Sequence, residues 1–414
     1  MANLAILGGD KLIKEEYLTL FPAWPPRDEE TAEVLKKTYM EGNWSFNSPA
    51  EQEFEKAFAE YHGAKYGIFM ANGTTTLECA LTALGVTKGD EVIVPALTWM
   101  ATALAASYVG ATPVIVDIEP TTLCMDPEKM RAAITPKTKA IIPVHVYGST
   151  ADMEKILEIA DAHGIPVIED CAHMHGGFWN GRGVGSWGKV GSFSFQQSKT
   201  MSSGEGGICI TNDPELAEKI YLLKHIGYSR GIKQGQAIRA PEGLLCHNYR
   251  ATAFQAVILS QQLKGLHKMI DTYSKNAAFL RESIKDIPGV RMQAPGRLSE
   301  PQGYYSFHLI FDGEPFKDIP KSIINAACDA EGFGIGNGTH GPVYKASLFN
   351  LDLSKGEYRI PDGRCAVCED LFDRTLGSAH YVLTHRTTVE KLSAVLHKIY
   401  DNIDELKQYA ASRA

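Results

Sequence analysis

The residues most able to do chemistry stand at the ends of predicted strands or at the starts of the helices that follow them. In ANGTTTLECAL (71–81), Gly73, Thr74 and Thr75 lie where a predicted strand leads into a helix. Free backbone N–H groups, hydroxyls and the helix dipole at such a turn favour an anion. The same pattern also fits a simple helix cap, so this segment alone leaves both interpretations open.

Two further segments supply a carboxylate and an amine. The apolar run IPVIEDCAH ends in Glu169 and Asp170, and an acid at the mouth of a buried strand is costly unless a partner lies there. GSFSFQQSK places Ser194 within a predicted strand and Lys199 just past it. The glycine-rich turn at 202–207 lets the backbone approach a ligand closely, which favours a functional lysine over a solvated surface one.

A flat ring completes the set. Trp99 follows Thr98 at the start of another predicted helix, where an indole could cover a flat ligand or simply pack. Together the segments offer an anion socket, a carboxylate, an amine and a ring. Pyridoxal phosphate (PLP) needs these groups: a phosphate socket, an acid that keeps the pyridine nitrogen protonated, a lysine for covalent attachment and a stacking partner. The combination predicts a PLP site.

The elements that must position these residues alternate between strands and helices. Seven runs, several of them continuously apolar, are predicted strands: 66–71, 91–96, 112–118, 140–146, 165–172, 191–196 and 207–211. Helices are predicted at 74–84, 98–109, 127–133, 151–163 and 214–225. This alternation predicts an α/β fold with a mostly parallel seven-stranded sheet, helices on both faces and ligands at the carboxyl ends of the strands.

The chain is expected to divide into an arm, a large domain and a smaller α+β domain, at 1–30, 31–262 and 263–414. A helix is predicted around 29–40, and a long one over 250–286 leads out of the sheet. The second domain is predicted to hold strands at 304–311 and 379–384 and helices at 320–330, 364–376 and 389–407.

Composition and charge exclude several classes of protein. The 41 Lys and Arg against 49 Asp and Glu give a net charge of −8, and no basic cluster is dense enough to neutralise nucleic-acid phosphates. The apolar runs fall short of the roughly 18 residues that span a bilayer. Since the amino-terminal segment also lacks the pattern of a signal peptide, we expect a cytoplasmic protein that binds neither membrane nor nucleic acid.

Two motifs resemble sites that the sequence does not otherwise support. Cys365, Cys368, His380 and His385 nearly match a zinc-finger spacing, but 364–376 is predicted as one helix of a larger domain, so we expect ordinary packing and no metal site.

Gly183, Gly185 and Gly188 form a GxGxxG pattern. A dinucleotide site needs a strand before this pattern and a helix after it, whereas here a strand follows it. The glycines are therefore not expected to bind a dinucleotide.

Six motifs spread over the chain resemble those of the DegT/DnrJ/EryC1/StrS aminotransferases, a branch of the fold-type I PLP enzymes: NGTTTLECAL, GDEVIVPALTW, IPVHVYG, IEDCAH, GSFSFQQSKTMSSGEGG and HNYRATAFQA. FSFQQSK, GEGG and the early Trp24-Pro25 are most similar to the subgroup that aminates cyclic ketones such as scyllo-inosose and 2-deoxy-scyllo-inosose. The 3-amino-5-hydroxybenzoate synthases are also similar here.

The resemblance implies a role for each matched residue. Lys199 would carry PLP, Asp170 would pair with its pyridine nitrogen, and Gly73 would lie in the turn that receives the phosphate. Further cofactor contacts would come from Thr74, Thr75, Ser194, Trp99, His173 and, from the neighbouring subunit, Asn248. The implied substrate residues are Arg250 for the donor carboxylate and, near the acceptor, His340 and Tyr344.

The resemblance implies a homodimer with shared sites that moves an amino group from glutamine or glutamate to a keto-cyclitol or keto-sugar. One alternative is a nucleotide-linked 4-keto-sugar acceptor, for which loop residues Lys233 and Arg239 could supply positive charge; a 3-amino-5-hydroxybenzoate synthase is another. A dehydratase is disfavoured because Lys199 is retained, since the dehydrating relatives have histidine there. A non-catalytic ligand-binding regulator is a remote alternative.

Overall fold

The computed structural model describes the chain except residues 1–2, 17–18, 233–234, 237–241, 337–339 and 414. Seven strands form its central sheet: β1 (Tyr66–Met70), β2 (Glu91–Pro95), β3 (Thr112–Val116), β4 (Thr138–Ile141), β5 (Ile168–Asp170), β8 (Val190–Ser194) and β9 (Gly207–Thr211). Hydrogen bonding gives the orders β1-β9-β8-β5 and β3-β2-β4, and parallel bridges Ile141–Val167 and Val144–Asp170 join the two parts. Only β9 runs antiparallel, so the predicted mostly parallel seven-stranded sheet is confirmed.

Apolar side chains on alternate positions pack against helices on opposite faces of this sheet. On β1, Ile68 and Met70 belong to the core that includes Leu77 of α3, whereas Phe69 packs with Phe54 of α2. The helices around the sheet are α2 (Pro49–Tyr61), α3 (Gly73–Ala83), α4 (Ala101–Tyr108), α5 (Pro127–Ala133), α6 (Met153–Ala162) and α7 (Pro214–Lys224). Side-chain N-caps begin α2, α3, α5, α6 and α7.

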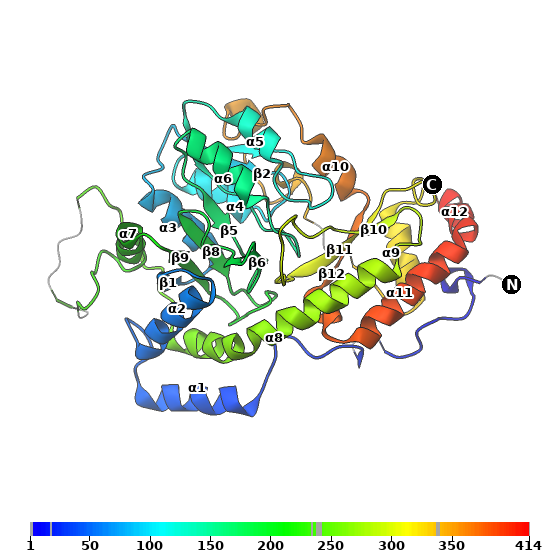
Figure 1. Cartoon of the computed structure of the whole chain (residues 1–414), viewed down its shortest axis with the longest axis horizontal. Coiled ribbons are helices and arrows are strands. Elements are labelled where there is room, and N and C mark those ends of the chain that lie inside the picture. The colour runs from blue at the N-terminus through cyan, green and yellow to red at the C-terminus, as the bar shows by residue number, and fades with distance from the viewer. Residues whose placement is uncertain (1–2, 17–18, 233–234, 237–241, 337–339, 414) are drawn as a thin grey trace.

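A second sheet lies at the other end of the molecule (Figure 1). It has the antiparallel order β10-β11-β12, formed by Val290–Met292, Ser306–Phe311 and Thr375–Ala379. Helices α9 (Lys321–Ala330), α11 (Arg386–Asp401) and α12 (Ile403–Ala411) accompany it. The 31-residue helix α8 (Ala253–Ser283) runs from the first sheet to the second.

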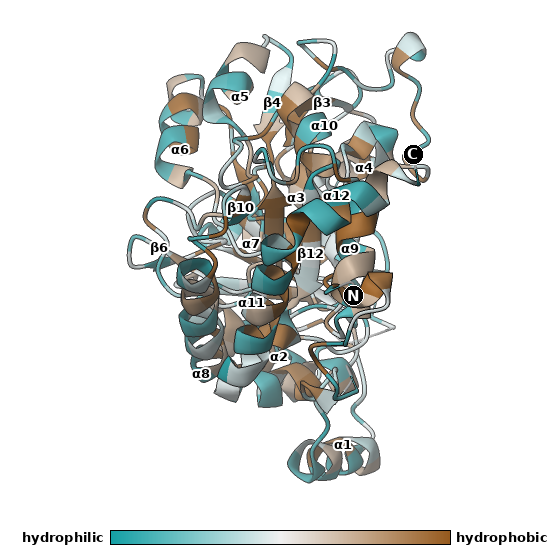
Figure 2. Cartoon of the chain, turned by 90° about the vertical axis from the view of Figure 1, so that its right-hand side faces the viewer, coloured by the Kyte–Doolittle hydropathy of each residue, from teal (hydrophilic) through white to brown (hydrophobic). Residues whose placement is uncertain are grey.

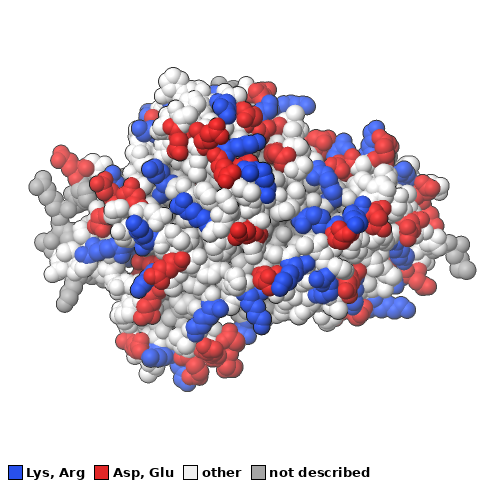
Figure 3. Space-filling model, viewed as in Figure 1, with Lys and Arg blue, Asp and Glu red and all other residues white. Residues whose placement is uncertain are grey.

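The outer elements carry most of the polar surface. Helix α1 (Glu29–Glu41) projects from the body and packs along α8 (Figure 1). Hydrophilic and hydrophobic stretches alternate along the amphipathic α11 in Figure 2. Acidic and basic side chains are interspersed over the face in Figure 3. Among the described residues, no helix has the length and apolar character needed to cross a membrane.

Three predictions for the second domain are wrong in detail. Residues 379–384 are not a strand: β12 comes earlier, because its pairing with β11 fixes it at Thr375–Ala379, and a 3-10 helix follows at His380–Thr384. Helix α10 spans only Ala366–Phe372, and the predicted 389–407 helix is two helices broken at Asn402.

Pairing with β11, which local periodicity does not carry, decided the position of β12. Helix α2 and the small hairpin β6 (Phe178–Trp179)–β7 (Arg182–Gly183) were not predicted, although Ser48-Pro49 is a cap signal for α2.

The proposed division at 262 and 263 stays a prediction. The structure adds that a later segment returns to the first sheet: Arg359 bridges to Val114 of β3, and Val343, Phe349 and Leu371 join the core around it. Cys365 and Cys368 are buried in this same core. His380 lies beside Tyr273 and Trp24. His385 is exposed.

Candidate active site

A cavity of about 740 Å³ opens at the carboxyl ends of the parallel strands. Nine of the residues singled out from the sequence line it: Gly73, Thr74, Thr75, Trp99, Asp170, His173, Ser194, Lys199 and His340. They come from segments more than 260 positions apart, and the strand ends bring them together as expected of an open α/β sheet.

Asp170 is a buried carboxylate held at the end of β5. The Thr102 hydroxyl donates to its Oδ2 at 2.8 Å, and the backbone N–H of Ala172 donates to its Oδ1 at 3.1 Å. The Thr98 hydroxyl lies 2.7 Å from that of Thr102. Burial raises the pKa of the Asp170 carboxyl, while the two hydrogen bonds and the nearby Lys199 charge oppose this rise. The site thus holds an oriented carboxylate suited to a cationic partner.

Lys199 follows the end of β8 and lines the cavity. Its Nζ is 4.2 Å from the centre of the Tyr305 ring, a cation–π distance. Burial lowers the pKa of Lys199 to about 8, and the Asp170 charge partly opposes the change. An amine with this pKa is neutral in a larger fraction of molecules than a surface lysine, and it can therefore act as a nucleophile or base.

The turn before α3 forms a socket against β8. Asn72 caps the helix by accepting from the backbone N–H of Thr75 at 3.0 Å. A methyl group added at Gly73 would lie 2.6 Å from the Ser194 Cβ, so only glycine permits this approach. The helix N-terminus and the Ser194 hydroxyl therefore face the same cavity, with room for a small anion such as phosphate.

Aromatic and histidine rings form one wall of the cavity. His173 stacks on Tyr305 with ring centres 4.2 Å apart, and its Nδ1 accepts from the backbone N–H of Tyr147 at 3.4 Å. His340 lies 5.5 Å from Trp99, centre to centre. Burial lowers the pKa of His340 to about 4 and that of His173 well below its usual range, so both rings are neutral at pH 7.

Three candidate residues lie outside this cavity. Asn248 is exposed, next to its bridge partner His225. Arg250 lies over the Phe46 ring, 5.4 Å from its centre. Tyr344 donates to Glu369 at 2.6 Å and accepts from the backbone N–H of Cys365, so both contacts are made within the 344–369 segment. The single chain brings none of the three to the cofactor residues.

Several lining residues had not been singled out: Asn72, Glu78, Thr98, Thr102, Tyr108, Gln196, Ser198, Glu205 and Tyr305. Thr102 lies in the first turn of α4 and Thr98 in the bend just before that helix, so the two hydroxyls meet at the helix start, 2.7 Å apart. No sequence signal pointed to Tyr305, because it lies just before β11, more than 100 residues away from Lys199.

The donor set matches the chemistry of PLP. The socket at Gly73 and Ser194 offers N–H and hydroxyl donors to a phosphate, Asp170 offers a carboxylate to a pyridinium, and Lys199 offers an amine to an aldehyde. The rings of His173 and Trp99 supply flat neighbours.

The family and the relatives that match this chain are aminotransferases, in agreement with the chemistry of this site. Residues 26–398 match the DegT/DnrJ/EryC1/StrS aminotransferase family. The chain is 35% identical over 408 residues to the L-glutamine:2-deoxy-scyllo-inosose aminotransferase of Streptoalloteichus tenebrarius, covering 94% of this chain and 96% of the relative. It is also 35% identical over 403 residues to the same-named protein of Streptomyces fradiae, covering 92% and 94%.

Solved structures give the same result. The crystal structure of 3-amino-5-hydroxybenzoic acid synthase superposes with a TM-score of 0.82 at 30% identity, covering 93% of this chain and 99% of that one. The crystal structure of DesI in the presence of its TDP-sugar product has a TM-score of 0.82 at 25% identity, covering 100% and 99%. With sequence and structure matched over nearly its whole length, the chain belongs to the DegT/DnrJ/EryC1/StrS family and is an aminotransferase with the type I transferase fold.

Proposed function

We propose that this enzyme binds PLP through Lys199 and transfers the amino group of glutamine to a keto-cyclitol of the scyllo-inosose type. The observation that carries the proposal is the meeting of Lys199, Asp170 and the Gly73–Ser194 socket in one cavity. The relatives named for a glutamine-dependent inosose amination support the donor and the acceptor class.

Bound PLP supplies an electron sink that acidifies the Cα–H bond of an amino acid. Lys199 Nζ takes the proton from the donor Cα and later delivers one to the acceptor carbon, acting as base and then as acid. Asp170 holds the proton at the pyridine nitrogen, and the Thr102 hydroxyl fixes its direction. Because the same residues serve two half-reactions in turn, the kinetics are expected to be ping-pong.

The cavity lining supports an uncharged acceptor. Among its described residues Lys199 is the one cation, whereas Glu78, Asp170 and Glu205 carry carboxylates. A nucleotide diphosphate would find no cationic partner in this set besides Lys199, while hydroxyls and neutral rings suit a polyol. Lys233 and Arg239, the residues considered for a nucleotide-linked sugar, lie outside the described residues.

We further infer a homodimer in which Asn248 serves the partner's phosphate site. Asn248 is exposed and lies on the segment between α7 and α8, whose described parts extend away from the body of the molecule (Figure 1). Arg250 is two residues on, and its Nη1 is buried with no hydrogen-bond partner among the described residues. A negatively charged donor carboxylate would supply the partner that this guanidinium lacks.

The test is an amination assay with defined acceptors. Purified protein is incubated with glutamine or glutamate and with either 2-deoxy-scyllo-inosose or a TDP-4-keto-sugar, and products are identified by mass spectrometry. We expect an aminocyclitol with glutamine and none with Lys199→Ala. Amination of the TDP-sugar alone would replace the proposed acceptor, and no product from any pair would contradict the proposal.

A further inference from the structure

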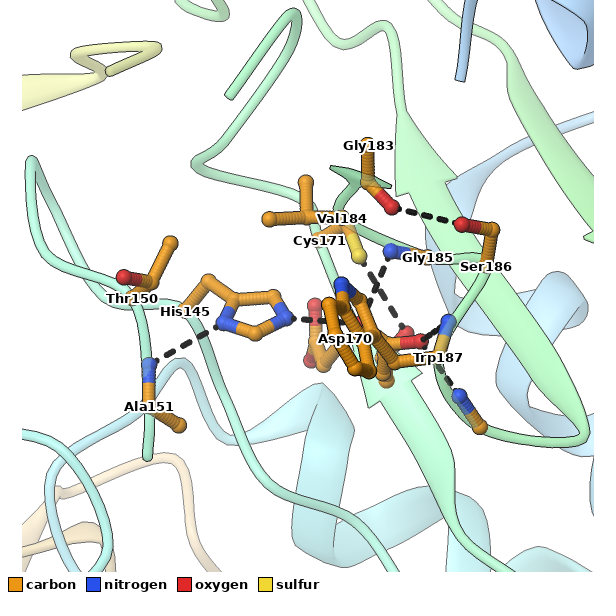
Figure 4. Close-up of polar contacts among 12 residues, drawn as sticks. His145, Thr150, Ala151, Asp170, Cys171, Gly183, Val184, Gly185, Ser186 and Trp187 are labelled. Atoms are coloured by element: carbon orange, nitrogen blue, oxygen red, sulfur yellow. Dashed lines mark hydrogen bonds and ion pairs between the residues drawn. The ribbon is translucent and has the colours of Figure 1, made fainter. Parts of the chain in front are cut away.

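Glu169, the neighbour of Asp170 on β5, is a fully buried carboxylate on the opposite face of the strand. Its Oε1 accepts from the backbone N–H groups of Trp187 and Gly188, each at 2.7 Å. Its Oε2 accepts from the backbone N–H of Gly185 at 2.8 Å and contacts His145 Nε2 at 3.0 Å (Figure 4). Four donors thus surround the Glu169 carboxylate, whose burial in the strand would be energetically costly without hydrogen-bond partners.

The hydrogen bonds fix which nitrogen of His145 carries the proton. The backbone N–H of Ala151 points at His145 Nδ1 from 3.1 Å, and an N–H group can only donate (Figure 4). Nδ1 is therefore the acceptor, so Nε2 carries the hydrogen and donates it to Glu169. The imidazole is neutral, and the carboxylate is held by dipoles rather than by a cation.

We call the four donors around the Glu169 carboxylate the cradle. The glycines of the 183–188 loop make it possible. A methyl group added at Gly188 would lie 2.5 Å from the carbonyl oxygen of Val167, and one at Gly185 would lie 2.7 Å from the ring of Phe193. Gly185 also has a φ of +85°. The GxGxxG pattern therefore wraps an anion, but the anion is a side chain of the same protein.

The hydrogen bonds around Glu169 tie β5 and β8, the strands that carry Asp170 and Ser194, to the segment at 143–145. Glu169 pairs with Gly191 of β8, which begins directly after the cradle loop and leads to Ser194. The backbone N–H of His145 donates to the carbonyl of Asp170 at 3.0 Å, and the N–H of Asp170 donates to the carbonyl of Pro143 at 2.9 Å. Displacing the Glu169 carboxylate would therefore shift the backbone that holds Asp170.

A metal ion does not explain this cluster. His145, Glu169 and Cys171 place potential ligand atoms within 4.8 Å of one another. Both nitrogens of His145 and both oxygens of Glu169 are already used by protein partners, so a metal would have to displace backbone donors that have no other acceptor here.

We infer that Glu169 is a positioning residue for the reaction: its carboxylate, gripped by the glycine loop and by neutral His145, fixes Asp170 in register with β8 and so fixes the pairing of Asp170 with the pyridine nitrogen. The inference rests on the proposed function, because Asp170 matters to catalysis only if PLP binds here.

The test replaces Glu169 by the isosteric amide. Glu169→Gln keeps the shape, but one oxygen becomes an NH₂ group that faces two donors, so backbone N–H groups lose their acceptor. We expect kcat to fall by about tenfold or more with a smaller change in KM. We also expect the pH midpoint of the absorbance of the PLP-bound enzyme to move, because that midpoint depends on the ring charge that Asp170 would maintain through the pyridine nitrogen.

A matched control is Glu331→Gln. Glu331 is equally buried and accepts from the backbone N–H groups of Ala5 and Leu12 and from the Lys398 ammonium, but it lies at the end of α9 and does not line the cavity. The Glu331→Gln variant should have a lower thermal stability but an unchanged pH midpoint. His145→Phe, which keeps the three backbone donors, should move the midpoint in the same direction as Glu169→Gln by a smaller amount, and it serves if the amide variant does not fold.

Two results would overturn the inference, and they are distinguishable. If the wild-type protein forms no PLP absorbance band, both the proposed function and the inference fail. If the wild-type band forms but Glu169→Gln and His145→Phe change only the melting temperature, as Glu331→Gln does, Glu169 is a structural residue and only the inference fails.

Discussion

At the scale of single residues, the site depends on how burial and mutual charge set the pKa values of Asp170 and Lys199. Burial pushes the pKa of Asp170 up and that of Lys199 down, and each charge opposes the shift of the other. The Thr102 hydroxyl further favours the ionised form of Asp170. The charged acid and a readily deprotonated amine can therefore coexist near neutral pH.

Removing the Thr102 hydroxyl should weaken catalysis without emptying the site. Thr102→Val keeps the shape and loses the 2.8 Å hydrogen bond to Asp170. Because a hydrogen bond to a charged group contributes about 1.5–3 kcal/mol, we expect kcat to fall by roughly tenfold or more. Steady-state kinetics beside Thr98→Val, which removes only the outer hydroxyl, provide the measurement. Equal kinetics for Thr102→Val and wild type would show that Asp170 needs no such partner.

The lowered pKa of Lys199 predicts its reactivity against pH. In the PLP-free protein its neutral amine should appear with a midpoint near pH 8, and the exposed Lys56 serves as the reference lysine for the acetylation reaction. Asp170→Asn should lower the Lys199 midpoint further, because the lost negative charge no longer favours the ammonium form. Competitive acetylation with peptide mass spectrometry measures both lysines at once. A Lys199 midpoint near the reference lysine pKa of about 10.4 would contradict this prediction.

At the scale of elements, the socket depends on the contact between the start of α3 and the end of β8. Gly73→Ala would place a methyl group 2.6 Å from the Ser194 Cβ and push the two elements apart. We expect PLP affinity to fall by about tenfold or more, with a loss of stability of roughly 1–3 kcal/mol. Gly265→Ala on α8, where an added methyl group meets nothing within 4 Å, is the control. PLP titration of Gly73→Ala with unchanged affinity would contradict the socket.

Elements with a clear local signal could be predicted from the sequence. The seven strands of the central sheet and helices α3 to α7 follow from continuous apolar runs and caps such as Asp213-Pro214. Lys199 and Asp170 could be placed in one cavity because parallel strands end at one edge. Strand β12 could not be located, since its pairing with β11 across more than 60 residues overrides the local pattern. The hydrogen bonds around Glu169 could not be predicted either, because three of the four donors are backbone N–H groups, which every non-proline residue carries.

At the scale of the whole molecule, the single chain supplies the cofactor residues but leaves Asn248 and Arg250 outside the cavity. If each Asn248 serves its partner's site, defects in Asn248 and Lys199 on separate chains should complement one another. Co-expressed, differently tagged Lys199→Ala and Asn248→Asp chains should yield heterodimers with one intact site, restoring about a quarter of wild-type activity to a random mixture. Activity no higher than the sum of the two separate variants would contradict shared sites.

The most direct test of the central claim is an absorption spectrum of the purified protein, with and without glutamine, beside that of Lys199→Ala. The account predicts a band near about 410–420 nm in the wild-type protein that declines when glutamine is added, and no such band in the variant. A wild-type protein that stays colourless after incubation with PLP, or a band that persists in Lys199→Ala, would contradict it.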